Sequence, residues 1–181
     1  MDILYIILVA VAFIVENVGQ MMKSKKYIIA FITVASLLYA ASYVCLQKPI
    51  PMIANLFNLY RGIEFIDLEK HNKPYTSYIL PSIIIIGGVA LSVGLLWSSP
   101  FDLFVLAATI IVTLTQIPKS ELIVRIGLFT QLAFWTVYNI IFNAYANLIS
   151  SVLKMVIIIA TIIYYNVYIP KRNNSKINKI I

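Results

Sequence analysis

The sequence predicts an all-α membrane protein with seven transmembrane helices, arranged as two parallel three-helix repeats joined by a linker helix. Its 181 residues are 61% hydrophobic and only 12% charged, whereas soluble domains are closer to half apolar and a quarter charged. The hydrophobic residues fall into successive runs of about 20 residues, the length that crosses a bilayer. The pattern of these runs repeats at an offset of 96 residues, as between Gln20 and Gln116.

Short polar or proline-containing breaks separate the runs and define the expected helices. Lysines end the first and second runs, and a polar loop at residues 69–76 follows the third, which is the most polar. Pro100 and Pro118 bound the short fifth run. The expected spans are residues 3–22, 27–47, 51–68, 78–97, 101–117, 122–142 and 147–168.

Basic residues predict how these spans are oriented. Seven spans place the termini on opposite sides of the membrane, and only Lys48 would lie on the side of the N-terminus. Because cytoplasmic loops carry an excess of Lys and Arg, we expect the N-terminus outside and the C-terminus in the cytoplasm. The residues expected on the cytoplasmic side are Lys23, Lys25, Lys26, Lys70, Lys73, Lys119, Lys171, Arg172, Lys176 and Lys179.

The net charge of +7 does not indicate a nucleic-acid partner, because the basic residues lie mainly between apolar runs and do not form one solvated patch. The single cysteine, Cys45, lies inside an apolar run. It predicts neither an intrachain disulfide nor a metal cluster. The lipid bilayer is therefore the expected surrounding of this chain.

An internal repeat is indicated by the helix ends as well as by hydropathy. At the 96-residue offset, Gln20-x-x-Lys-Ser aligns with Gln116-x-x-Lys-Ser, although two similar loops can also agree by chance. The expected units are a first three-helix repeat with its loop at 1–76, a linker helix at 77–98, a second repeat at 99–169 and a basic tail at 170–181. Three helices plus one linker leave both repeats in the same orientation, as parallel repeats.

Three short motifs carry a resemblance to a known family. They are the lysine-rich turn after the first span, Asn58-x-x-Arg61 in the third, and Phe134-Trp135-Thr-Val-Tyr138-Asn139 in the sixth. Over nearly its full length the chain resembles the YgjV-type bacterial inner membrane proteins, which implies a location in the bacterial cytoplasmic membrane.

The layout is also distantly similar to the sugar-facilitator and PQ-loop superfamily, whose members are mostly small-solute transporters. That superfamily carries a Pro-Gln pair at the ends of its first and fifth helices. Gln20 and Gln116 match the glutamines, but Gly19 and Thr115 stand where the prolines would be. The departure argues against hinges made of proline.

Ionisable side chains inside the spans are further functional candidates, because each costs roughly 2.5 to 3.5 kcal/mol near the bilayer centre. They are Glu16, Arg61, Glu64 and Lys154. Glu16 and Arg61 each lie about 10 Å from the cytoplasmic ends of their helices, so we expect them to form an ion pair. The pair would be a structural clasp or a gating element, and the third alternative is that the two side chains make no contact. Glu64 shares the polar face of Arg61.

The repeat predicts a polar cavity at its centre. At the 96-residue offset Asn58 aligns with Lys154 and Asn55 with Ser151, and equivalent positions of parallel repeats face each other across the axis. In the similar facilitators, asparagines of the third and seventh helices bind substrate together with neighbouring aromatic residues. This resemblance implies a substrate site of Asn58, Lys154, Tyr39 and Trp135, with Tyr43 and Asn139 as second choices.

Lys154 in such a site would favour an anionic or carboxylate-bearing solute. The alternative is a structural role, in which these side chains hydrogen-bond to neighbouring helices or extend toward the lipid headgroups. The sequence is compatible with both interpretations of these polar residues.

No catalytic arrangement is evident, since the sequence has one His, one Cys and no glycine-rich phosphate loop. We expect neither an enzyme nor a cofactor or metal site. Two functions remain. One is a small-solute transporter or facilitator that works by alternating access, and the other is a non-transporting receptor or assembly partner with the same fold.

Overall fold

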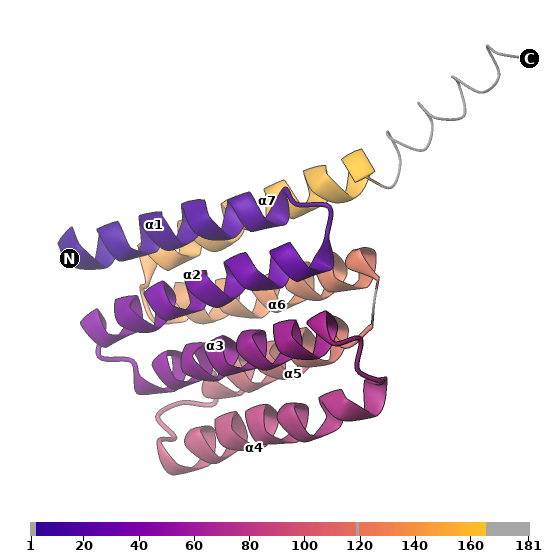
Figure 1. Cartoon of the computed structure of the whole chain (residues 1–181). Helices are drawn as coiled ribbons and strands as arrows, with labels where there is room; N and C mark the ends of the chain where they lie inside the picture. Colours follow the sequence, from indigo (N-terminus) through magenta and orange to yellow (C-terminus); the bar gives the residue numbers. More distant parts are fainter. Residues whose placement is uncertain (1–2, 119, 166–181) are drawn as a thin grey trace, which may run out of the picture.

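The computed structural model describes residues 3–118 and 120–165, and these residues form seven α-helices and one 3₁₀ helix (Figure 1). The helices coincide with the seven predicted runs to within a few residues. The predicted basic tail, 170–181, lies outside the described residues. The elements are α1 (Ile3–Gln20), α2 (Lys25–Cys45), α3 (Pro49–Lys70), η1 (Tyr75–Tyr78), α4 (Ile79–Leu95), α5 (Asp102–Gln116), α6 (Glu121–Ile141) and α7 (Tyr145–Ile163).

The helix starts follow local rules of the sequence. Pro49 begins α3, at a position where its missing N–H costs no helical hydrogen bond. Ser120 precedes α6, and its side chain accepts a hydrogen bond from the backbone N–H of Ile123. Helix boundaries could thus be predicted from the breaks between apolar runs.

The exterior and interior of the bundle have the polarity of a membrane protein. Four helical segments are long and apolar enough to cross a membrane: α1, α2, the continuous Tyr75–Leu95 and α7. Large apolar side chains face outward, and Ile3 and Leu95 are 76% and 74% exposed, whereas Arg61 is 1% exposed. Burying a charge while exposing aliphatic side chains is favourable only where the surroundings are apolar.

Successive helices run in alternating directions, so α1, α3, α5 and α7 share one direction (Figure 1). Within the first group, α2 packs against α1 and α3; within the last, α6 packs against α5 and α7. Helix α4 contacts α3 and α5, while α1 also contacts α7. The chain thus brings its first and last helices side by side.

Helix boundaries recur along the chain at the offset of 96 residues. Helices α2 and α6 each follow a serine, at Ser24 and Ser120, and each is followed by a residue with positive φ, Gln47 at 52° and Asn143 at 55°. The first residues of α3 and α7, Pro49 and Tyr145, and the last residues of α1 and α5, Gln20 and Gln116, obey the same offset.

A close contact between neighbouring helices also recurs at the 96-residue offset. The glycine lies on the first helix of the pair in one case and on the second helix in the other. A Cβ on Gly19 of α1 would collide with the side chain of Phe31 of α2. At the equivalent positions, a Cβ on Gly127 of α6 would collide with Thr115 of α5. Both crossings therefore need one residue without a side chain, as is common where membrane helices approach closely.

Candidate solute-binding cavity

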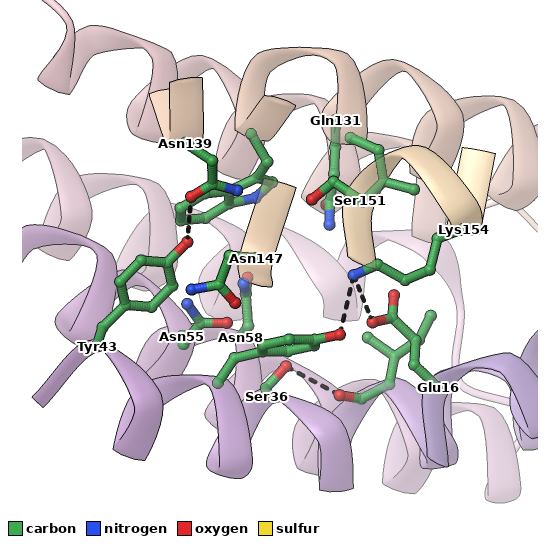
Figure 2. Close-up of a pocket in the computed structure, with 14 residues that line it drawn as sticks. Glu16, Ser36, Tyr43, Asn55, Asn58, Gln131, Asn139, Asn147, Ser151 and Lys154 are labelled. Atoms are coloured by element: carbon green, nitrogen blue, oxygen red, sulfur yellow. Dashed lines mark hydrogen bonds and ion pairs between the residues drawn. The ribbon is translucent and has the colours of Figure 1, made fainter. Parts of the chain in front are cut away.

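A cavity of about 40 Å³ lies inside the bundle (Figure 2). A water molecule needs roughly 10 to 15 Å³ by this measure, so the space accommodates about three water-sized groups. Helices α1, α2, α3, α6 and α7 supply its walls. The lining residues are Glu16, Ile32, Ser36, Tyr39, Tyr43, Asn55, Asn58, Gln131, Leu132, Trp135, Asn139, Asn147, Ser151 and Lys154.

The structure brings the sequence-predicted substrate residues together at this cavity. Its lining includes Asn58, Lys154, Tyr39, Trp135, Asn55, Ser151, Tyr43 and Asn139. Five pairs of lining residues obey the 96-residue offset, and one of them is in direct contact, because the hydroxyl of Tyr43 donates to Oδ1 of Asn139 at 2.9 Å. This contact brings together two positions of α2 and α6 that the 96-residue offset relates.

A buried ion pair forms the charged end of the cavity, on one side of the close-up in Figure 2. Lys154 Nζ of α7 lies 2.9 Å from Oε2 of Glu16 in α1, and the two side chains are 6% and 5% exposed. The ammonium also donates to the Tyr39 hydroxyl at 3.2 Å and lies 4.5 Å from the centre of that ring. Ser150 in turn holds the same hydroxyl at 3.0 Å.

Amide side chains gather at the opposite end of the cavity (Figure 2). Asn139 is bonded to Tyr43, whose ring stacks on Trp135 with 5.8 Å between centroids. Both polar side-chain atoms of Asn147 are buried without a hydrogen-bond partner in the described part of the chain, and so is Oε1 of Gln131, nearer the middle of the cavity. Buried polar groups of native proteins are nearly always bonded, to protein or to ordered water, so these amides suit a polar occupant.

Two apolar clusters lie along the bundle on either side of these polar residues. One combines Tyr43 and Trp135 with residues where α2 ends and α5 begins, among them Ala108. The other combines Ile28 and Ile32 of α2 with residues from the opposite ends of α5, α6 and α7. Apolar packing therefore flanks the polar cavity along the bundle.

The predicted ion pair of Glu16 with Arg61 is wrong. Glu16 binds Lys154 instead, while Arg61 donates to Oδ1 of Asn58 at 2.8 Å and to the Thr113 hydroxyl at 3.4 Å. Equal depth in the bundle is necessary for a pair but does not fix which helix faces the carboxylate. Arg61 is fully buried next to the cavity without lining it, and Glu64 is half-buried away from it.

Five lining residues were missed by the sequence reasoning. They are Ile32, Ser36, Gln131, Leu132 and Asn147. Ser36 precedes Tyr39 by three residues and so shares its helix face, and Gln131 is a polar residue within an apolar run, which is a signal in itself. Asn147 stood at an expected span end, where solvation explains an asparagine equally well.

No group of three or more His, Cys, Asp or Glu side chains that could hold a metal ion occurs in the part of the chain that the structure describes. The lining of the cavity offers hydrogen-bonding groups, one ion pair and aromatic faces. Such groups bind and orient a small polar molecule.

These features define the class of the protein: a helical membrane protein with a buried, polar, partly charged cavity. The family model of Imp-YgjV, described as bacterial inner membrane protein, matches residues 3–168. The chain belongs to this family, which places it in the bacterial inner membrane. No curated protein and no solved structure gave a match.

Proposed function

We propose that this protein is a small-solute transporter or facilitator, that the cavity is its solute-binding site, and that it works by alternating access between two three-helix repeats. The observation that carries the proposal is the polar, partly charged cavity inside a bundle whose outer surface is apolar. Polar side chains inside a membrane are costly and commonly mark a solute pathway.

The proposed architecture is seven spans in a three, one, three arrangement. The recurrence of helix boundaries and the shared direction of α1 and α5 support it. The polar composition of α3 also fits a span, because its asparagines and Arg61 are buried inside the bundle. With 22 residues this helix is roughly 33 Å long, enough to cross the hydrocarbon core.

The proposed orientation has the N-terminus outside and the C-terminus in the cytoplasm. The turn after α1 contains Lys23, and the end of α3 carries Lys70, at the same end of the bundle, while Lys48 follows α2 at the other end (Figure 1). This asymmetry supports the orientation through the positive-inside rule.

The proposed solute is small, polar and without net charge. The sequence alone suggested that Lys154 would favour an anionic solute. Glu16 neutralises Lys154, so the lysine does not make the cavity cationic. Hydrogen-bond donors and hydrogen-bond acceptors both surround the space. Its volume of about 40 Å³ favours a solute of a few non-hydrogen atoms. We propose no covalent chemistry and no cofactor.

Uptake into proteoliposomes tests the proposal. Purified full-length protein should accelerate the entry of at least one solute from a panel of small sugars, polyols, amino acids and short carboxylates. Ser151→Leu places an apolar side chain in the cavity and should abolish that uptake. Val152→Leu, at the neighbouring position, which is 45% exposed on the outside of the same helix, should retain it.

A receptor or assembly partner is the second candidate, and the small volume of the cavity favours it. A folded protein that transports no member of the panel, while Ser151→Leu and Val152→Leu behave alike in every assay, would support this second function. Equal uptake by the two variants would instead show that the transported solute does not pass through the cavity.

A further inference from the structure

We propose that the solute is a small zwitterion, an α-amino acid or a close analogue, whose carboxylate binds Lys154 and whose ammonium binds Glu16. This rests on the proposed role of the cavity as the solute site. The binding mode is an exchange in which the direct ion pair between α1 and α7 opens and the solute bridges the two side chains. Each protein charge keeps an opposite charge beside it throughout.

Charge balance favours a zwitterion over a simple ion. An anion that captured Lys154 would leave the Glu16 carboxylate buried beside a second negative charge, and a cation that captured Glu16 would do the reverse for Lys154. Both side chains are about 95% buried, and a buried charge without a partner is strongly unfavourable. A solute that carries both charges replaces the pair without this penalty.

The hydrogen-bond capacity of the pair is also only partly used. An ammonium has three N–H donors, and Lys154 directs one to Glu16 and one to Tyr39 among the described residues. Glu16 accepts through Oε2 alone in the same part of the chain. Among the described residues, one ammonium N–H of Lys154 and one carboxylate oxygen of Glu16 are therefore left for a solute, and both side chains line the cavity.

Tyr39 suits this exchange because it holds the lysine independently of the glutamate. Its hydroxyl lies 3.2 Å from Nζ and its ring centre 4.5 Å away, and Ser150 fixes the hydroxyl from the other side. Lys154 can therefore turn from Glu16 toward a solute carboxylate while two of its favourable contacts persist. A cation over the face of an aromatic ring is stabilised most where water is excluded, as it is here.

A zwitterion is preferred over an uncharged polar solute because of bond strength. An uncharged solute leaves the Glu16 to Lys154 pair in place and adds only neutral partners to it. A zwitterion gives up the one charged hydrogen bond between Lys154 and Glu16 and forms two in its place. The net gain is one hydrogen bond in which both donor and acceptor are charged, and such a bond is about twice as strong as a neutral one. The small cavity restricts the rest of the molecule to a short side chain, facing the amides of Asn55 and Asn147.

Four matched solutes test the inference in proteoliposomes containing the full chain. Glycine carries both charges, glycolate lacks the ammonium, ethanolamine lacks the carboxylate, and ethylene glycol lacks both. We expect glycine, with alanine or serine, to be taken up, and the three others to bind about ten- to hundredfold more weakly. Binding is measured in parallel as protection of the detergent-solubilised protein against thermal unfolding by each solute.

The outcomes separate this inference from the proposed function. Uptake of ethylene glycol or of a sugar, without uptake or binding of the zwitterions, would overturn the zwitterion assignment and leave transport standing. Binding of glycine without any uptake would support the site and overturn transport. Absence of both binding and uptake of every zwitterion in a folded protein would overturn the inference outright.

A charge-free variant gives the second arm of the test. Glu16→Gln combined with Lys154→Met removes both charges together, so neither is left buried alone, and should weaken glycine binding about ten- to hundredfold. Glu121→Gln combined with Lys70→Gln removes one charge of each sign away from the cavity and should bind like the unmodified protein. Equal glycine binding by the two double variants would overturn the assignment.

Discussion

The two halves of the molecule share their backbone plan but differ in their charges. Helices α1 to α3 carry Glu16 and Arg61 inside the bundle, whereas α5 to α7 place Val112 and Ile157 at the equivalent positions. Conversely, α7 carries the charged Lys154 at the position where α3 has the neutral Asn58. Glu16 is paired across the halves with Lys154, and Arg61 is left with neutral partners.

This difference teaches that position and chemistry are set separately. Positions related by the 96-residue offset meet at the cavity, while the charges that the two halves do not share set its chemistry. Tyr43 and Asn139 are equivalent and bond to each other, so even one symmetric pair contains two different residue types. A cavity with a charged end and an amide end can orient an asymmetric solute, which two identical halves could not do.

The largest loss of stability should come from removing only one member of the ion pair between Glu16 and Lys154, which joins the two halves. Lys154→Met leaves the Glu16 carboxylate buried without its partner, and we expect the free energy of unfolding in detergent to fall by about 3 to 5 kcal/mol. Glu16→Gln added to Lys154→Met should recover a large part of this loss. A double variant no more stable than Lys154→Met would show that the two charges do not interact.

A smaller effect should follow from filling the equivalent helix crossings of the two halves. Gly127→Ala would press a methyl group into Thr115, and Gly19→Ala one into Phe31, so each should destabilise the protein by about 1 to 3 kcal/mol. Gly87→Ala is the control, since the added group would meet no described atom within 4 Å beyond its chain neighbours and its own helix backbone, and it should be neutral or up to about 1 kcal/mol stabilising. Thermal unfolding of the three variants measures the order, and a loss in Gly87→Ala equal to the others would contradict close packing as the cause.

The smallest effect should come from Arg61, although it is as buried as the charges of the ion pair. Arg61→Met loses hydrogen bonds to Asn58 and Thr113 but removes a buried cation without a carboxylate partner among the described residues. Replacing buried charges by apolar side chains is often neutral or stabilising, so we expect a change within about 1 kcal/mol. A loss as large as that of Lys154→Met would mean that Arg61 is neutralised by an acidic group.

The sequence by itself determined the class of the protein, the places of its helices and most of the cavity. Hydropathy and helix breakers act locally along the chain, so runs such as 27–47 could be assigned without knowing their neighbours. The 96-residue offset added the distant pairs, and the predicted Asn58 and Lys154 do line one cavity.

Only the tertiary structure decided which buried charges meet. Glu16 and Arg61 lie at similar depth, but successive residues of a helix turn by about 100°, so depth says nothing about the direction in which each side chain points. Glu16 points toward α7 because α1 packs against both α2 and α7. That contact joins the first and last helices of the chain, and local sequence patterns carry no record of it.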